Sequence, residues 1–303
     1  MIIRPETDGD YAAIAEVNAR AFGRASEAII VDVHRHRAAF DPELSLVAEI
    51  DGRVIGHALF SPRTIRVMDS DVHAVSLGPI AVLPAHQRQG VGRALIDEGH
   101  QAAISKGRTV SFLVGHPTYY PRFGYRTNAY GRATVLVPTA ELPDTGLEGT
   151  PVTGEDLPAL HALWRADEAG VDFAIDPGTS LTDWISPNPA ITSLVFRDDV
   201  SIIGYVRQHK DRPTDPVSFL ARDAGSARAM AGALARQSTA EAITLPVHPR
   251  SRSAAAFGPA RVEPFAAAMA IELAPGPLGE YFAQLEAGTR PQGRVIWPVE
   301  FDL

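Results

Sequence analysis

The sequence predicts an α/β (α+β) fold in which two similar units follow one another along the chain, each a sheet flanked by helices. Three observations support this prediction. At 303 residues the chain is long enough for about two domains. Helix-like and strand-like hydrophobic patterns alternate along it. Several segments of the first half recur in the second half in the same order.

The first recurring segment predicts a helix in each half. PETDGDYAAIAEVNARAF begins at Pro5, and PVTGEDLPALHALWRADE begins at Pro151. Both place apolar residues at helical spacing, and both open with a Thr and an Asp that favour a helix start. We therefore expect two equivalent amphipathic helices.

The second recurring segment predicts a pair of strands. LVAEIDGRVIGHAL from Leu46 aligns without a gap with LVFRDDVSIIGYVR from Leu194. In the first copy Asp51-Gly52 is a strong hairpin signal. Each copy is expected to form two strands joined by a tight turn.

A third match completes the order of elements. VSFLVGHP from Val110 aligns with AITLPVHP from Ala242, and a Phe-Gly pair follows in both halves. This order favours a tandem duplication of one αβ unit. We expect domains at residues 1–145 and 146–303, joined through the Pro- and Gly-rich segment 138–151.

Between these elements, LGPIAVLPAHQRQGVGRALI predicts a strand, a loop and a helix start. Gly78-Pro79 should place a bulge or an unpaired edge in the strand, since proline cannot donate to a ladder. A helix from Val91 leaves its first N–H groups without helical partners, and its dipole adds positive charge there. Glycines at 90 and 92 expose this backbone. The pattern indicates a phosphate or pyrophosphate site.

Two motifs here resemble the GNAT superfamily of acetyl-CoA-dependent N-acyltransferases. QRQGVG, Gln87 to Gly92, matches the family's acceptor loop, and IAVLP from Ile80 is similar to its preceding strand. GHPTYYPRFGYR from Gly115 resembles the signature of a bacterial subgroup of predicted N-acetyltransferases. The resemblance is strong to about residue 135 and weak beyond. It implies mixed, mostly antiparallel sheets and acetyl-CoA as cosubstrate, with no metal.

The resemblance also implies roles for individual residues. Backbone groups of one strand segment would pair with the pantetheine arm of CoA, and the loop and helix start would surround the pyrophosphate. Tyr120, four residues before the motif glycine, would protonate the departing thiolate as general acid. The residues expected to bind cofactor are Ile80, Ala81, Val82, Gln87, Arg88, Gln89, Gly90, Val91, Gly92 and Arg93.

The base that deprotonates the attacking amine stays open. Many family members have a glutamate on the strand before the loop, where this chain has Ser76, Leu77 and Gly78. His116, Glu27 and His73 are the alternatives. Tyr119 is the alternative to Tyr120 as the acid.

The second half lacks both features. RDAGSARAMAGAL has no Gly-x-Gly, Asp223 stands where phosphate would lie, and SAAAFG replaces the tyrosine. We expect a degenerate unit that binds no CoA and forms part of the acceptor cleft. The arrangement resembles the enhanced-intracellular-survival acetyltransferases, in which the terminal carboxylate reaches the active site. Whether the carboxylate of Leu303 does so in this chain stays open.

Other residues have simpler interpretations. His34 and His36 diverge on a helix and are expected to be solvated, and His57 is expected to be structural. Phe22 and Trp164 are expected in the core. The last ten residues, which contain Pro298, resemble a final edge strand.

Composition excludes several function classes. With no cysteines, the chain has no disulfides, thiol catalysis or Cys-type zinc site. A net charge of -8 and the absence of a basic footprint argue against nucleic acid. No apolar run approaches the ~20 residues that span a bilayer, and the start lacks a signal-peptide pattern, so we expect a cytoplasmic protein.

The favoured function is therefore an acetyl-CoA-dependent N-acetyltransferase acting on a small-molecule or peptide amine. The alternative is a non-catalytic acyl-CoA-binding or sensing module. Acceptor identity, acyl chain length and oligomeric state are not readable from the sequence, and a homo-oligomer is compatible with it.

Overall fold

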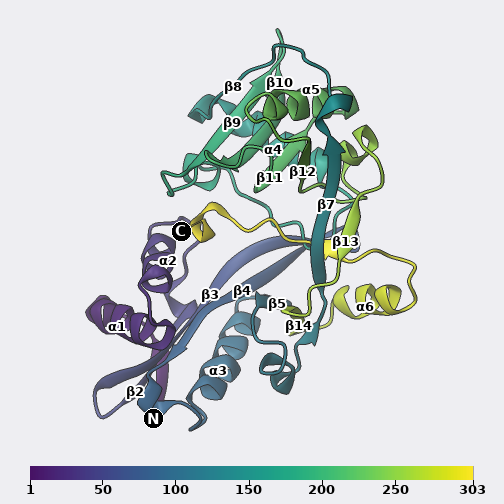
Figure 1. Ribbon diagram of the computed structural model, residues 1–303. Helices are drawn as coiled ribbons and strands as arrows, with labels where there is room; N and C mark the ends of the chain where they lie inside the picture. The colour runs from purple at the N-terminus through teal and green to yellow at the C-terminus, as the bar shows by residue number, and fades with distance from the viewer. Residues whose placement is uncertain (303) are drawn as a thin grey trace.

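The computed structural model describes residues 1–302, which form two α/β units, one above the other in Figure 1. This confirms the expected fold class. The lower unit contains a seven-stranded sheet that is antiparallel except between β4 and β5. In spatial order its strands are β1 (Ile2–Pro5), β2 (Ser45–Ile50), β3 (Arg53–Val67), β4 (Ser70–Val82), β5 (Val110–Val114), β14 (Ala268–Glu272) and β6 (Arg126–Thr127).

The upper unit contains two smaller sheets. The first has the strands β11 (Ser218–Ala221), β10 (Ile202–His209), β9 (Ile191–Arg197) and β8 (Gly149–Pro151). The second has β12 (Ala242–Leu245), β7 (Tyr130–Pro138) and β13 (Arg261–Glu263), with β15 (Gly293–Arg294) also paired to β7. The α-helices are α1 (Tyr11–Phe22), α2 (Ser26–Arg35), α3 (Val91–Ser105), α4 (Leu157–Asp167), α5 (Ala224–Ala235) and α6 (Leu278–Glu286).

The two units exchange one strand each. β7 follows β6 in sequence, yet it leaves the lower sheet and pairs with β12 and β13 of the upper unit. In return β14, which follows β13, inserts between β5 and β6 of the lower sheet. Figure 1 shows β7 reaching up into the upper unit while β14 lies beside β5. Each unit is therefore completed by a strand from the other half of the chain.

This exchange differs from the expected contiguous division into residues 1–145 and 146–303. The boundary falls in the connection between β7 and β8, but cutting there would remove β14 from the lower sheet. It would also remove from β7 both of its antiparallel partners. Residues that are contiguous in the sequence therefore do not all belong to the same unit.

The two helix starts and the first hairpin turn formed as expected. Thr7 and Thr153 both build capping boxes with the aspartate three residues later, just before α1 and α4. Asp51 and Gly52 both have positive φ, which is the geometry of the hairpin turn expected between β2 and β3. These motifs depend on neighbouring residues alone, so the sequence is sufficient to predict them.

α1 and α3 cover opposite faces of β3. The His57 imidazole faces α1, where its Nδ1 lies 3.1 Å from the amide nitrogen of Asn18. The preceding residue, Gly56, lies beneath α3, and a Cβ there would be 3.0 Å from Val91. Because side chains alternate along a strand, neighbouring residues serve the two faces. Phe22, expected in the core, lies instead at the exposed end of α1, whereas Trp164 is buried as expected.

The C-terminal segment is not the expected final strand. Only Gly293–Arg294 pairs with β7, and the chain then runs to a short 3-10 turn at Val299–Phe301. Glu300 is fully buried and binds Arg63 at 2.6 Å and Arg37 at 3.2 Å. A buried carboxylate needs such partners, which direct this segment toward α2 instead of along the sheet (Figure 1). Leu303 lies outside the described residues.

His57 gives the fold a measurable acid sensitivity. It is fully buried, and burial lowers its pKa to about 3, below the 6.5 of an exposed imidazole. Asn18 donates to its Nδ1, so the neutral ring donates from Nε2 to the Ser45 hydroxyl, which donates to Glu6. The unfolded chain binds a proton that the folded chain excludes. The contribution of neutral His57 to the free energy of unfolding is therefore fully present above pH 6.5, and it is lost as the pH falls toward 3.

We therefore expect the free energy of unfolding, measured in urea, to fall as the pH is lowered from 7.5 to 5. His57 should account for about 1.4 kcal/mol of this fall per pH unit below 6.5. Comparison with His57→Gln isolates the contribution, because other buried groups titrate in both proteins. The stability advantage of the wild type should shrink by about 2 kcal/mol over this range. Identical pH dependence in both proteins would contradict the assignment.

Candidate active site

A cleft opens where β4 and β5 separate. The two strands pair only from Ala74 to Ser76 of β4. Beyond this point β4 continues along β3, with a register shift at the expected Gly78-Pro79 interruption. The side of β4 that turned toward β5 now borders a cavity of about 1030 Å³, which we call the main cavity. A strand edge bordering a cavity can pair with an extended ligand.

The far end of the main cavity is formed by the loop before α3. Arg88 and Gly90 both have positive φ, and α3 starts at Val91 without a side-chain cap among residues 1–302. The helix therefore presents uncapped N–H groups and its positive dipole end. The side chains of Gln87 and Gln89 hold the loop, donating to the carbonyls of Val82 and Ala85.

The main cavity brings most of the expected site residues together. Its walls include Ile80, Ala81, Val82, Gln87, Arg88, Gly90, Gly92, Arg93 and Tyr120. Two expected residues do not line it. Val91 is buried because its side chain packs on Gly56 beneath α3, and the Gln89 amide is turned to Ala85. At Val91, only the backbone is suited to the expected role.

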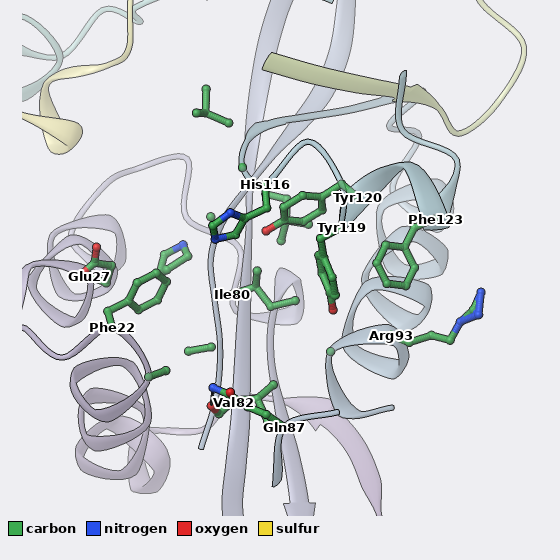
Figure 2. Close-up of a pocket in the computed structure, with 18 of the residues that line it drawn as sticks. Phe22, Glu27, Ile80, Val82, Gln87, Arg93, His116, Tyr119, Tyr120 and Phe123 are labelled. Carbon is green, nitrogen blue, oxygen red and sulfur yellow. Dashed lines mark hydrogen bonds between the residues drawn. The ribbon is translucent and has the colours of Figure 1, made fainter. Parts of the chain in front are cut away.

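Tyr119 and Tyr120 point to different parts of the cavity. Figure 2 shows the Tyr120 hydroxyl directed toward His116 and the Tyr119 hydroxyl directed away from it. The Tyr119 oxygen lies at the start of α3, 2.6 Å from where a Cβ of Gly92 would be. The Tyr120 ring lies on Gly115, where a Cβ would be 2.2 Å from the ring. Burial raises the pKa of Tyr120 to about 12, so the phenol stays protonated at neutral pH.

The three candidate bases are not equivalent. His116 lines the main cavity beside Tyr120 and is exposed (Figure 2). Glu27 also lines it, from α2, and is held by Arg24 at 2.5 Å. His73 does not line it and lies on the β4 segment before the strands separate. The geometry therefore leaves His116 and Glu27 as the candidates for the base that deprotonates the amine.

The sequence reasoning missed residues from distant parts of the chain. Phe22, expected in the core, is 42% exposed and lines the main cavity. Ile30 of α2 and Phe301 of the C-terminal turn also line it. The only available signal was an aromatic residue directly before Gly23, where α1 ends. Nothing local to Phe301 indicates its place.

His34 differs from its expected solvated position. It is buried, and its ring packs edge-on against Phe301 at 5.5 Å between centroids. The C-terminal turn therefore covers the face of α2 that was expected to be open.

Within residues 1–302 no group of three or more His, Cys, Asp or Glu side chains is arranged to hold a metal.

In the upper unit, the region compared with this site contains a buried carboxylate, Asp167. Gly204 pairs with Ala221 as Gly56 pairs with Val82, so Ala221 is the counterpart of Val82. Its N–H donates to Asp167, which also accepts two hydrogen bonds from Ser253, in the segment that follows β12.

The start of α5 is capped as well. Asp223 accepts a hydrogen bond from the Ser226 N–H at 2.8 Å. The helix dipole end is thereby neutralised by a carboxylate of the chain itself. This helix start therefore does not offer the uncapped N–H groups that α3 presents.

Comparison with known proteins decides the family. The family model described as an acetyltransferase (GNAT) domain matches residues 2–127. The chain is 34% identical over 131 residues to YhbS of Escherichia coli K12, an uncharacterized N-acetyltransferase, covering 43% of this chain and 76% of YhbS. This chain belongs to the GNAT family of acetyltransferases.

A second GNAT relative is more similar over a shorter stretch. YjhQ of Escherichia coli K12, also an uncharacterized N-acetyltransferase, is 40% identical over 117 residues, which is 38% of this chain. The match spans 64% of the length of YjhQ. Both relatives match less than half of this GNAT chain.

A solved GNAT structure extends the likeness to the second half at the level of fold. The GCN5-related N-acetyltransferase from Kribbella flavida superposes with a TM-score of 0.71, covering 90% of this chain and 72% of its own. Its identity to this chain is 17%, so the match concerns architecture alone.

None of the helices among residues 1–302 combines the length and apolar character needed to cross a bilayer.

Proposed function

We propose that this GNAT protein is an acetyl-CoA-dependent N-acetyltransferase that acts on a primary amine of a small molecule or peptide. The observation that carries the proposal is the main cavity, which runs from the bordering edge of β4 to the uncapped start of α3. An extended pantetheine arm fits the first feature and a pyrophosphate fits the second.

The reaction proceeds by direct attack in a ternary complex. The amine nitrogen bonds to the acetyl carbon, and the carbonyl oxygen becomes an oxyanion. The carbon–sulfur bond then breaks, and Tyr120 gives its phenol proton to the departing thiolate. His116 or Glu27, both lining the cavity, takes the proton of the amine, directly or through water.

The upper unit is proposed to bind no CoA. Asp223 occupies the helix start, and Asp167 accepts the N–H that corresponds to the one expected to meet the cofactor. In this proposal the upper unit forms part of the acceptor cleft, while the C-terminal half of the chain completes the lower sheet through β14.

The direct test measures acetyl-CoA consumption across a library of amines, together with calorimetric titration of CoA. We expect CoA binding and turnover with at least one amine class. Binding of CoA without turnover on any amine would favour the alternative, a non-catalytic sensing module. Failure to bind CoA would overturn both.

The pyrophosphate site can be tested by removing its charges. Arg88→Gln together with Arg93→Gln should raise the Kd for CoA about 10-fold, because hydrogen bonds to charged groups are worth about 1.5–3 kcal/mol and these side chains are exposed. Binding of pantetheine, which lacks the phosphates, should not change. Arg53→Gln, outside the cavity, serves as the control. An equal loss for both ligands would contradict the assignment.

A further inference from the structure

A second cavity, of about 690 Å³, lies between the two units and adjoins the main cavity. Leu77, Gly78, Val114 and Phe301 line both. Gly78 belongs to the β4 interruption, next to the edge assigned to the pantetheine arm. The second cavity therefore borders the place where the acetyl group would lie.

The strand exchange brings polar residues of both halves into this cavity. Arg132 comes from β7, which has crossed to the upper unit, and Arg207 and His209 come from β10. Asp302 comes from the C-terminal segment. Much of the remaining wall is apolar and includes Ile191, Val217, Phe265, Val295, Ile296 and Trp297.

Arg207 and Asp302 form an incomplete pair. Their side chains are 4% and 6% exposed, and Nε of Arg207 lies 3.5 Å from Oδ2 of Asp302. Within residues 1–302 neither atom has a hydrogen-bond partner, although another guanidinium nitrogen of Arg207 donates to the Trp297 carbonyl at 2.6 Å. Buried charged atoms without hydrogen bonds are costly, so a ligand that both accepts and donates would satisfy both.

Arg132 adds a second cation to the same wall. It is exposed, its guanidinium lies 4.4 Å above the Phe265 ring, and it forms no ion pair among residues 1–302. The cavity therefore carries two guanidinium groups against one carboxylate, in addition to His209. This balance favours a ligand with an acidic group and disfavours a polycation.

We propose that the second cavity binds the acceptor, and that this acceptor is a primary amine that also carries a carboxylate. Arg132 and Arg207 hold the carboxylate, and Asp302 accepts a hydrogen bond from the amine. The proposal rests on the acetyl transfer proposed above, in which the amine nitrogen replaces sulfur on the acetyl carbon. It narrows the acceptor class to amino-acid-like molecules with an apolar side chain.

The test compares acceptors that differ only in the carboxylate. Phenylalanine with 2-phenylethylamine, and tryptophan with tryptamine, are two such pairs. We expect kcat/KM to favour the amino acid by about 10-fold or more, the value of one charged hydrogen bond. Arg132→Gln should remove most of this preference by raising KM for the amino acids more than for the amines. Arg261→Gln, an exposed arginine on β13 outside the cavity, is the matched control.

Calorimetry with each acceptor in the presence of CoA measures binding without transfer and separates the two proposals. The amino acids could bind in a way that depends on Arg132 while no amine is acetylated. That result would contradict the acetyltransferase function and support the acceptor site. Transfer to amines with no preference for the carboxylate, or no binding of either amino acid, would overturn the acceptor proposal. Arg207→Lys, which keeps the charge and loses the planar fork, should also weaken amino-acid binding.

Discussion

The Tyr120→Phe variant is expected to bind CoA normally and to lose most of its acetyl transfer. Removing a general acid typically lowers a rate by about 10²–10⁴-fold, because the leaving thiolate must then take its proton from water. The phenol is well suited to the role, since burial raises its pKa to about 12 and keeps it protonated near neutrality. Release of free CoA thiol measures kcat, and calorimetry measures the Kd.

Tyr119→Phe provides the matched control for this experiment. Its ring packs edge-on against Tyr120 at 5.1 Å, but its hydroxyl lies at the start of α3. We expect kcat to stay within about 3-fold of wild type, which is less than 1 kcal/mol. If Tyr119→Phe loses the rate and Tyr120→Phe keeps it, Tyr119 is the acid and the assignment above is wrong.

A chain that ends at residue 145 is expected not to fold. It lacks β14, whose Ala268, Met269 and Ala270 are all fully buried. Met269 belongs to the core cluster beneath α1 and α3, whereas the two alanines belong to a separate cluster beside α6. Losing the strand would open both cores, and the truncated chain would expose unpaired edges of β5, β6 and β7, which promote aggregation.

Expression of residues 1–145 and of the full chain, compared by soluble yield and urea unfolding, measures this effect. We expect the short chain to be insoluble or to lack a cooperative transition. Co-expression with residues 146–303 should restore a soluble complex that binds CoA, because β14 is then available. A stable, monomeric 1–145 fragment that binds CoA would show that β14 is dispensable.

Much of the local structure follows from the sequence because its causes are local. A capping box needs only a threonine and the aspartate three residues on, as at Thr7 and Thr153. The hairpin needs only Asp51 and Gly52. The loop from Gln87 into α3 is equally local, and most of its expected ligand-binding residues do line one cavity.

The strand exchange depends on causes that no short window contains. β7 and β14 are both apolar strands that follow a short strand, and either could in principle complete either sheet. Their partners are decided by contacts between residues far apart, such as Met269 of β14 with the core that contains Leu113. Sequence periodicity gives a strand its faces but not its neighbours.

The same limit explains the errors at the site. The predictions of a solvated His34 and a core Phe22 depend only on the helix that contains each residue. The turn that contains Phe301 and Glu300 covers His34, while the end of α1 leaves Phe22 at the cavity. The second cavity draws its walls from segments 76–132, 191–217 and 265–302, so only the folded chain defines it.

The position of β14 in the chain has a consequence during synthesis. β5 and β6 both pair with β14, which ends at residue 272. β14 is therefore synthesised long after β5 and β6 have left the ribosome. Throughout that interval the nascent protein displays strand edges that invite premature association. Cells that make it rapidly should therefore recover more active enzyme when translation is slowed or holdase chaperones are abundant.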